Sequence, residues 1–98
     1  MGAYIERVTT DTLIHRGPCL LFRVRPQVAV AGQRVEVYDG EDMIAGVLRD
    51  KIICDVNVPA SADYGPGAYF HQGLFVHIVT AGDAATVVWM PLPPEEVS

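Results

Sequence analysis

The 98-residue chain has little of the chemistry that enzymes use. Its only serines are Ser61 and Ser98, and neither stands in the glycine-flanked pattern that exposes a nucleophile. The two cysteines, Cys19 and Cys54, lie in separate apolar segments and not in a CxxC pair, which favours buried free thiols over a disulfide or a zinc site. We therefore expect a protein that is not an enzyme and has no catalytic residues.

Patterns that bind metals or phosphates are also missing. His71 and His77 would share a strand face only if Gly73 did not interrupt the strand between them, so a metal pair is weakly supported. The acidic turn at 39–42 lacks the alternating oxygen ligands and the distal glutamate of a calcium loop, and a solvated hairpin turn explains it better. The glycines at 65–67 precede no helix-opening pattern. We expect no metal and no cofactor.

The charge balance argues against nucleic-acid partners. Twelve acidic and seven basic residues give a net charge of −5, and no basic stripe is present to neutralise phosphates. No apolar run approaches the roughly 20 residues that a membrane span needs. The first residues have neither a basic segment nor an apolar one of the kind that begins a signal peptide. We expect no membrane partner and synthesis in the cytoplasm.

What the chain does have is apolar alternation with a period of two. In the segment 19–25, alternation predicts one face with Leu20, Phe22 and Val24, and a second face with Leu21 and the arginines. The segment 34–38 alternates in the same way and stops at the turn dipeptide Asp39-Gly40, after which 43–49 is a candidate returning strand.

Further segments repeat this pattern at intervals of about ten residues. The segment 52–58 alternates most regularly and ends at Pro59, while 74–79 places Leu74, Val76 and Ile78 on one side. Additional strands are expected at 4–8, 12–15 and 86–90. The pattern predicts an all-β fold of about eight strands, of the kind found in sandwiches and barrels, forming a single domain over residues 1–90.

Two segments are candidates for contact with a partner. Residues 59–68 are the longest stretch without periodicity and carry glycines on both sides of Pro66, which predicts a surface loop that would present Tyr64. Residues 91–98 are predicted to form an extended tail, because prolines fix the backbone angle φ and lack an N–H donor. Leu92 and Pro93 in this tail could reach a neighbour.

Several apolar residues fall where alternation predicts solvent. They are Leu21, Tyr38, Phe75 and Trp89. A two-sheet core could bury them, and scattered exposed apolar side chains are normal, so ordinary burial and a protein interface are equally favoured.

Turn and aromatic residues between positions 10 and 90 give the chain a resemblance to a known family. The stretches are Gly17-Pro18-Cys19-Leu20-Leu21, Val35-Glu36-Val37-Tyr38-Asp39-Gly40, Phe70-His71-Gln72-Gly73-Leu74-Phe75-Val76 and Thr86-Val87-Val88-Trp89. The chain resembles small virion proteins of tailed bacteriophages, in which a YDG or WDG hairpin precedes an F-x-x-GLYV strand. It departs from them in Phe75, where tyrosine is usual, and in its proline-rich tail.

The resemblance implies an antiparallel, jelly-roll-like β-sandwich of about eight strands that serves as a structural protein of the phage particle, such as a capsid decoration (cement) or head-fibre protein. The expected partners are the major capsid protein and further copies of the chain, which would form a homo-oligomer, expected to be a trimer, on the capsid surface of the virion. Outward apolar residues and an extended tail suit a protein held among identical neighbours. The predicted protein-interface residues are Tyr64, Pro66, Tyr69, Phe75, Trp89, Leu92 and Pro93.

Two alternatives remain at this point. The first is a glycan-binding head-fibre or adsorption module, in which Tyr64, Tyr69 and Trp89 would stack on sugars while Asp63 and Gln72 fix their orientation. The second places the same fold in the tail or neck of the particle.

Overall fold

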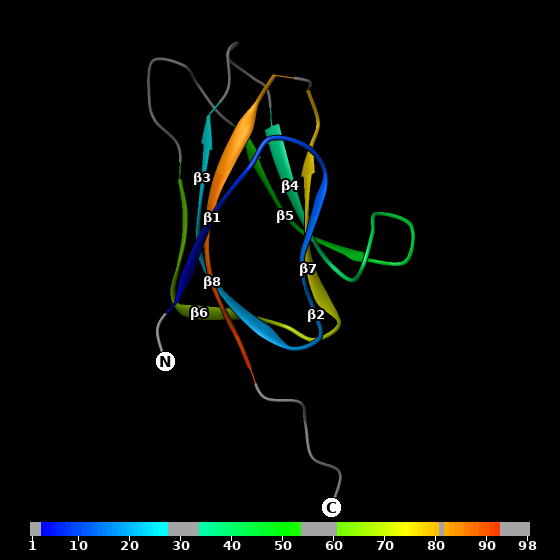
Figure 1. The fold of residues 1–98 in the computed structure, drawn as a ribbon, viewed down its shortest axis with the longest axis vertical. Coiled ribbons are helices and arrows are strands. Elements are labelled where there is room, and N and C mark those ends of the chain that lie inside the picture. Colours follow the sequence, from blue (N-terminus) through cyan, green and yellow to red (C-terminus); the bar gives the residue numbers. More distant parts are fainter. Residues whose placement is uncertain (1–2, 28–33, 54–60, 81, 93–98) are drawn as a thin grey trace, which may run out of the picture.

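The computed structural model describes residues 3–27, 34–53, 61–80 and 82–92. The regular structure in these ranges consists of strands in two antiparallel four-stranded sheets, β1-β8-β3-β6 and β2-β7-β4-β5 (Figure 1). The predicted all-β sandwich of about eight strands is confirmed. The strands are β1 (Tyr4–Val8), β2 (Thr12–Arg16), β3 (Cys19–Gln27), β4 (Arg34–Asp39), β5 (Val47–Ile53), β6 (Ala62–Phe70), β7 (Gly73–Ile78) and β8 (Ala84–Pro91).

The strand order is that of a jelly roll. Strand β1 pairs with β8, β2 with β7, β3 with β6 and β4 with β5, so the chain follows one long hairpin. Two further pairings, β8 with β3 and β7 with β4, roll this hairpin into two facing sheets. The turn between β4 and β5 is the closed end of the rolled hairpin, and it projects from the side of the sandwich (Figure 1).

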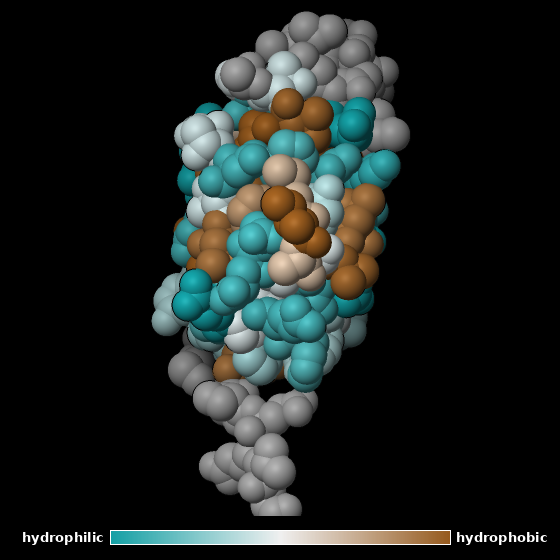
Figure 2. Space-filling view, turned by 90° about the vertical axis from the view of Figure 1, so that its right-hand side faces the viewer, coloured by the Kyte–Doolittle hydropathy of each residue, from teal (hydrophilic) through white to brown (hydrophobic). Residues whose placement is uncertain are grey.

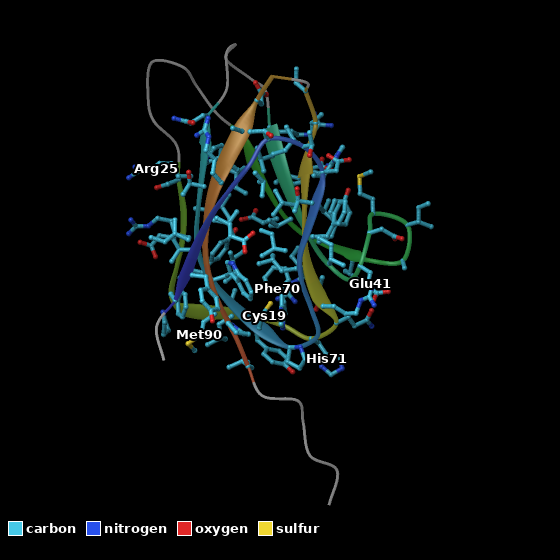
Figure 3. The ribbon with its side chains drawn as sticks, in the orientation of Figure 1. Cys19, Arg25, Glu41, Phe70, His71 and Met90 are labelled. Atoms are coloured by element: carbon cyan, nitrogen blue, oxygen red, sulfur yellow. The ribbon has the colours of Figure 1, made fainter. Side chains whose placement is uncertain are left out.

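The core fills the space between the two sheets. Leu74, Val76 and Ile78 of β7 belong to it, as their alternation predicts. Cys19 is a buried free thiol, as predicted, and Figure 3 places it with Phe70 between the sheets. Burial, with a smaller contribution from the negative charge of Asp39, raises the pKa of this thiol to about 12. Cys54 lies outside the described residues.

The prediction for the faces of β3 is wrong because the strand contains a β-bulge. The register shifts between Leu21 and Arg23, where β3 has one residue more than its partner β8. Leu21 and Val24 both point into the core, although they are three residues apart. Leu20 and Phe22 are only partly buried and lie outside the core cluster. An extra residue reverses the alternation, so Leu21 is an ordinary core residue.

The loop predicted at 59–68 is also wrong within the described residues, because Ala62–Phe70 forms β6 at the edge of its sheet. The irregular sequence is accommodated by the pairing with β3. Leu21 faces Ala68 and Arg23 faces Asp63, so 64–67 bulge out between these pairs. Gly65 and Gly67 have φ angles of 60° and 121°, which favour glycine. Residues 59 and 60 lie outside the described ranges.

Other boundaries differ in smaller ways. The returning strand of the β4–β5 hairpin begins at Val47 and not at Met43, because residues 41–46 form a wider turn. Of the alternating segment 52–58, Ile52 lies in the core and 54–60 fall outside the described residues. Strand β8 continues through Pro91, and the N–H of Leu92 donates to the Pro18 carbonyl at 3.0 Å, so the predicted tail does not start at 91.

Candidate functional site

The structure does not gather the predicted interface residues into one surface. Trp89 is 5% exposed and belongs to the core, with its ring 5.3 Å from that of Tyr4 and 5.1 Å from that of His15. The prediction of an outward Trp89 is therefore wrong. Tyr64 is only partly exposed, because its ring packs against the core and its hydroxyl donates to Asp50 of the opposite sheet at 2.7 Å. Burial, with the hydrogen bond to Asp50, raises the pKa of Tyr64.

Phe75 lies on the outer face of β7, as predicted, but it is covered. It is 9% exposed and pairs in register with Leu13 of β2 and Tyr38 of β4, whose ring meets it edge to face at 6.3 Å. Neighbouring side chains of the same sheet therefore bury Phe75. An exposed role predicted for Phe75 is wrong.

The remaining predicted residues lie apart from one another. Pro66 and Tyr69 are exposed on β6, whereas Leu92 follows β8 and is partly buried. Pro93 lies outside the described residues. The three rings proposed to stack on sugars do not form a platform, because Trp89 is buried and Tyr64 is directed at Asp50. Only Tyr69 is exposed enough for such a contact.

A group of exposed apolar side chains lies at the closed end of the β4–β5 hairpin, and it includes the most exposed one among the described residues, Ile44. Ile44 is 95% exposed and Val47 is 64% exposed, and Met43 and Leu48 are exposed beside them. We call these four residues the apolar tip. Figure 2 looks onto the side from which this hairpin projects and shows hydrophobic side chains in the middle of that face, bordered by hydrophilic ones. Exposed apolar side chains that gather on one projecting turn are typical of a protein-binding site.

The turn that carries the apolar tip is held in one conformation by Asp42. Its carboxylate accepts hydrogen bonds from the N–H groups of Ile44 at 2.9 Å and Ala45 at 2.7 Å, and its carbonyl accepts one from Gly46 at 2.9 Å. Gly40 and Gly46 approach each other so closely that a Cβ on either would meet backbone atoms. A rigid turn loses little conformational entropy when it binds a partner.

Asp39 fixes the base of the hairpin to the rest of the sandwich. Its carboxylate accepts hydrogen bonds from the N–H groups of His71 at 3.0 Å and Gln72 at 2.8 Å, in the turn between β6 and β7. Arg49 approaches the same carboxylate at 3.5 Å and lies over the ring of Phe70, 5.2 Å from its centroid. The apolar tip is therefore presented on a base that is hydrogen-bonded to the turn joining β6 and β7.

The outer face of the β2-β7-β4-β5 sheet carries a buried carboxylate. Glu36 accepts hydrogen bonds from Nε of Arg34 and the hydroxyl of Tyr38, both at 2.9 Å. Burial acts to raise the pKa of Glu36, but the two hydrogen bonds and the positive charge of Arg34 outweigh it and leave the pKa below its ordinary value of 4.5. The folded chain therefore favours the charged form.

This lowered pKa predicts a pH-dependent contribution to stability. A depressed pKa in the folded state stabilises the protein above the unfolded pKa, and this stabilisation is lost as the pH falls through the folded value. We expect the stability difference between the natural chain and Glu36→Gln to be largest near pH 7 and to shrink towards pH 3. Urea unfolding at a series of pH values measures it, and a difference that does not change with pH would contradict this account of Glu36.

The histidine and acidic side chains of the described residues are not grouped as metal ligands. These residues hold no cluster of three or more His, Cys, Asp or Glu side chains placed to bind a metal ion. His77 is held by Asp11, whose carboxylate lies 2.8 Å from Nδ1 and also accepts the N–H of Ile78 at 2.9 Å. Nor do these residues include a helix with the length and apolar character of a membrane span.

Sequence reasoning missed the apolar tip although a signal was present. Met43 and Ile44 directly follow three acidic or glycine turn residues, and Gly46 separates them from the next strand. The prediction placed Met43 and Ile44 in a strand with cross-strand neighbours, whereas the wider turn leaves them without such neighbours.

Comparison of the chain with protein-family models, with curated proteins and with solved structures finds no match.

Proposed function

We propose that this chain is a non-enzymatic structural protein of a tailed-phage particle, which binds the outside of the capsid as a homo-oligomer and stabilises it. One observation carries the proposal: four apolar side chains are exposed at the end of a hairpin that is braced on a rigid sandwich. Desolvation of Ile44 and Val47 would be favourable, because burying apolar surface contributes about 25 cal/mol per Å².

The shape of the tip favours a protein partner over a small molecule. Small ligands are bound in concave pockets, whereas this hairpin projects from the sandwich (Figure 1). Projecting apolar side chains on a preorganised turn are suited to fill a pocket on another protein surface. The expected partners are other copies of the chain and the major capsid protein.

The fold and the resemblance add support of a weaker kind. Jelly rolls occur in viral capsid proteins, lectins and cupins, so the fold alone selects no function. The resemblance to small virion proteins favours the first of these classes. The lectin alternative loses support because two of its three proposed rings are buried or bonded within the sandwich.

The proposal is tested by adding the purified chain to capsid shells that lack it. We expect the protein to sediment with the shells and to raise the temperature at which they release their contents. Ile44→Asp places a charge at the most exposed apolar position, and we expect it to weaken shell binding by at least about tenfold, which corresponds to 1.4 kcal/mol.

Thr10→Asp is the matched control, because it adds the same charge to an exposed residue of another turn. It should bind shells as the natural chain does. If the natural chain neither binds nor stabilises shells, the proposed function is wrong. If Ile44→Asp binds as well as the control, the apolar tip has no part in that function.

A further inference from the structure

A second exposed surface lies on the outer face of the β1-β8-β3-β6 sheet. Arg7 and Arg25 both pair in register with Thr86 of the central strand β8, so these three side chains form a row across the sheet. Arg23 and Ile5 form the next row, because both pair with Val88. Strands in a sheet are about 4.8 Å apart, which places Arg7 and Arg25 roughly 10 Å from each other.

Apolar side chains accompany the arginines on this face. Ile5 is 71% exposed, and Leu20 and Phe22 are partly exposed because the bulge in β3 turns them outward. Leu20 and Phe22 lie beside Gly67 of β6, where a Cβ would come within 3.2 Å of each of these two side chains. We call the surface formed by Ile5, Arg7, Leu20, Phe22, Arg23 and Arg25 the arginine face.

The arginine face is positive in a chain that is acidic as a whole. Three arginines stand against one carboxylate, Asp63, which lies 3.2 Å from Arg23 and is itself exposed. Within the described residues no ion pair involves Arg25. The face therefore has an excess of two positive charges, while the net charge of the chain is −5.

The β4–β5 hairpin has the complementary character. Glu41 and Asp42 directly precede Met43 and Ile44, so acidic and apolar groups stand side by side on one projecting turn. Arg16 pairs with Glu41 but leaves Asp42 as a net negative charge. Figure 3 places Glu41 and Arg25 on opposite sides of the sandwich, so a single copy cannot bring its own two surfaces together.

We infer that the hairpin of one copy docks on the arginine face of the next, with the apolar tip against Ile5 and Phe22 and the acidic turn against the arginines. The inference rests on the proposed function, since it names the surfaces through which copies on a shell join. Complementary charges set the orientation of such a contact, and the apolar groups supply most of its affinity.

The contact is heterologous, because it joins two different surfaces. Each copy then offers one donor surface and one acceptor surface, so the assembly either closes into a ring or continues as a chain. A ring that closes after three copies would be the trimer expected from the sequence. Linked copies would also bind a shell at several points, which increases their retention through multivalency.

Sedimentation velocity of the purified chain without shells tests the inference. We expect concentration-dependent assembly of the natural chain, and monomers for both Ile44→Asp and Arg25→Glu at a concentration where the natural chain is assembled. Lys51→Glu is the control for reversed charge, because Lys51 is exposed on the other sheet at the end of β5 away from the tip. It should assemble normally. Thermal unfolding verifies that each variant is folded.

A mixture of the two variants that stay monomeric alone tests whether the two surfaces bind each other. Ile44→Asp retains the arginine face and Arg25→Glu retains the hairpin, so a mixture should form a dimer of one copy each that does not grow further. A natural chain that stays monomeric would overturn the inference. So would normal assembly of Arg25→Glu, because that result indicates a contact between two hairpins. Shell binding is measured separately, so it can succeed or fail independently of this experiment.

Discussion

Replacing Leu21 by alanine is expected to lower the free energy of unfolding by about 3 kcal/mol, while Leu20→Ala lowers it by about 1 kcal/mol or less. Leu21 is fully buried between the sheets, so its truncation removes apolar contacts and leaves a cavity. Leu20 lies outside the core cluster and is partly exposed, so solvent can fill the space that its side chain leaves. Urea unfolding of both variants measures the two losses.

This pair of substitutions tests the bulge in β3 directly. Simple alternation from 19 to 25 places Leu20 inside and Leu21 outside, and it predicts the opposite order of losses. Leu20 and Leu21 have the same side chain and are adjacent, so composition and strand propensity are matched. A larger loss for Leu20→Ala would show that the bulge is absent and that the arginine face is wrongly composed.

Asp39→Ala is expected to lower the free energy of unfolding by about 3 kcal/mol. The N–H groups of His71 and Gln72 would lose their acceptor, and Arg49 would lose its nearby carboxylate. Asp39→Asn should have a smaller effect, because its amide retains one of the two acceptor oxygens. Glu41→Ala, in the same hairpin, removes an exposed ion pair and should cost at most about 1 kcal/mol.

Hydrogen exchange gives this prediction a local measurement. The amide protons of His71 and Gln72 should exchange faster in Asp39→Ala than in the natural chain, whereas those of β1 should change only through global stability. Equal stability of Asp39→Ala and Glu41→Ala would contradict the role of Asp39 in anchoring the hairpin.

The sequence predicted the fold well because strand formation in this chain depends on local patterns. The alternation at 74–79 and the turn residues at 39–40 each mark a strand or its end within a few residues. Regular spacing of such strands indicated a sandwich, and the jelly-roll strand order fits that class.

The errors have a common physical cause in pairing between distant strands. A bulge depends on the residue count of the partner strand, so the reversal at Leu21 cannot be read from 19–25 alone. For the same reason Gly65 and Pro66 indicated a loop, although β3 pairs with the residues on both sides of them. The predicted exposure of Trp89 and Phe75 was wrong for a related reason, because side chains from other strands cover both residues.

The candidate site could be recognised only once the three-dimensional fold was known. The apolar tip and the arginine face each combine residues whose exposure depends on the turn width and on the bulge, respectively. The sequence places acidic and apolar residues next to each other at 41–44. Only the three-dimensional structure shows that the β4–β5 hairpin and the arginine face lie on opposite sides of one sandwich.

Electron microscopy of shells incubated with the chain tests whether it binds capsids. We expect added density on the outer surface of the capsid, with each sandwich in contact with the next through the β4–β5 hairpin. Bare shells, or density confined to the tail or neck of complete particles, would contradict the claim that this chain is a capsid-binding structural protein.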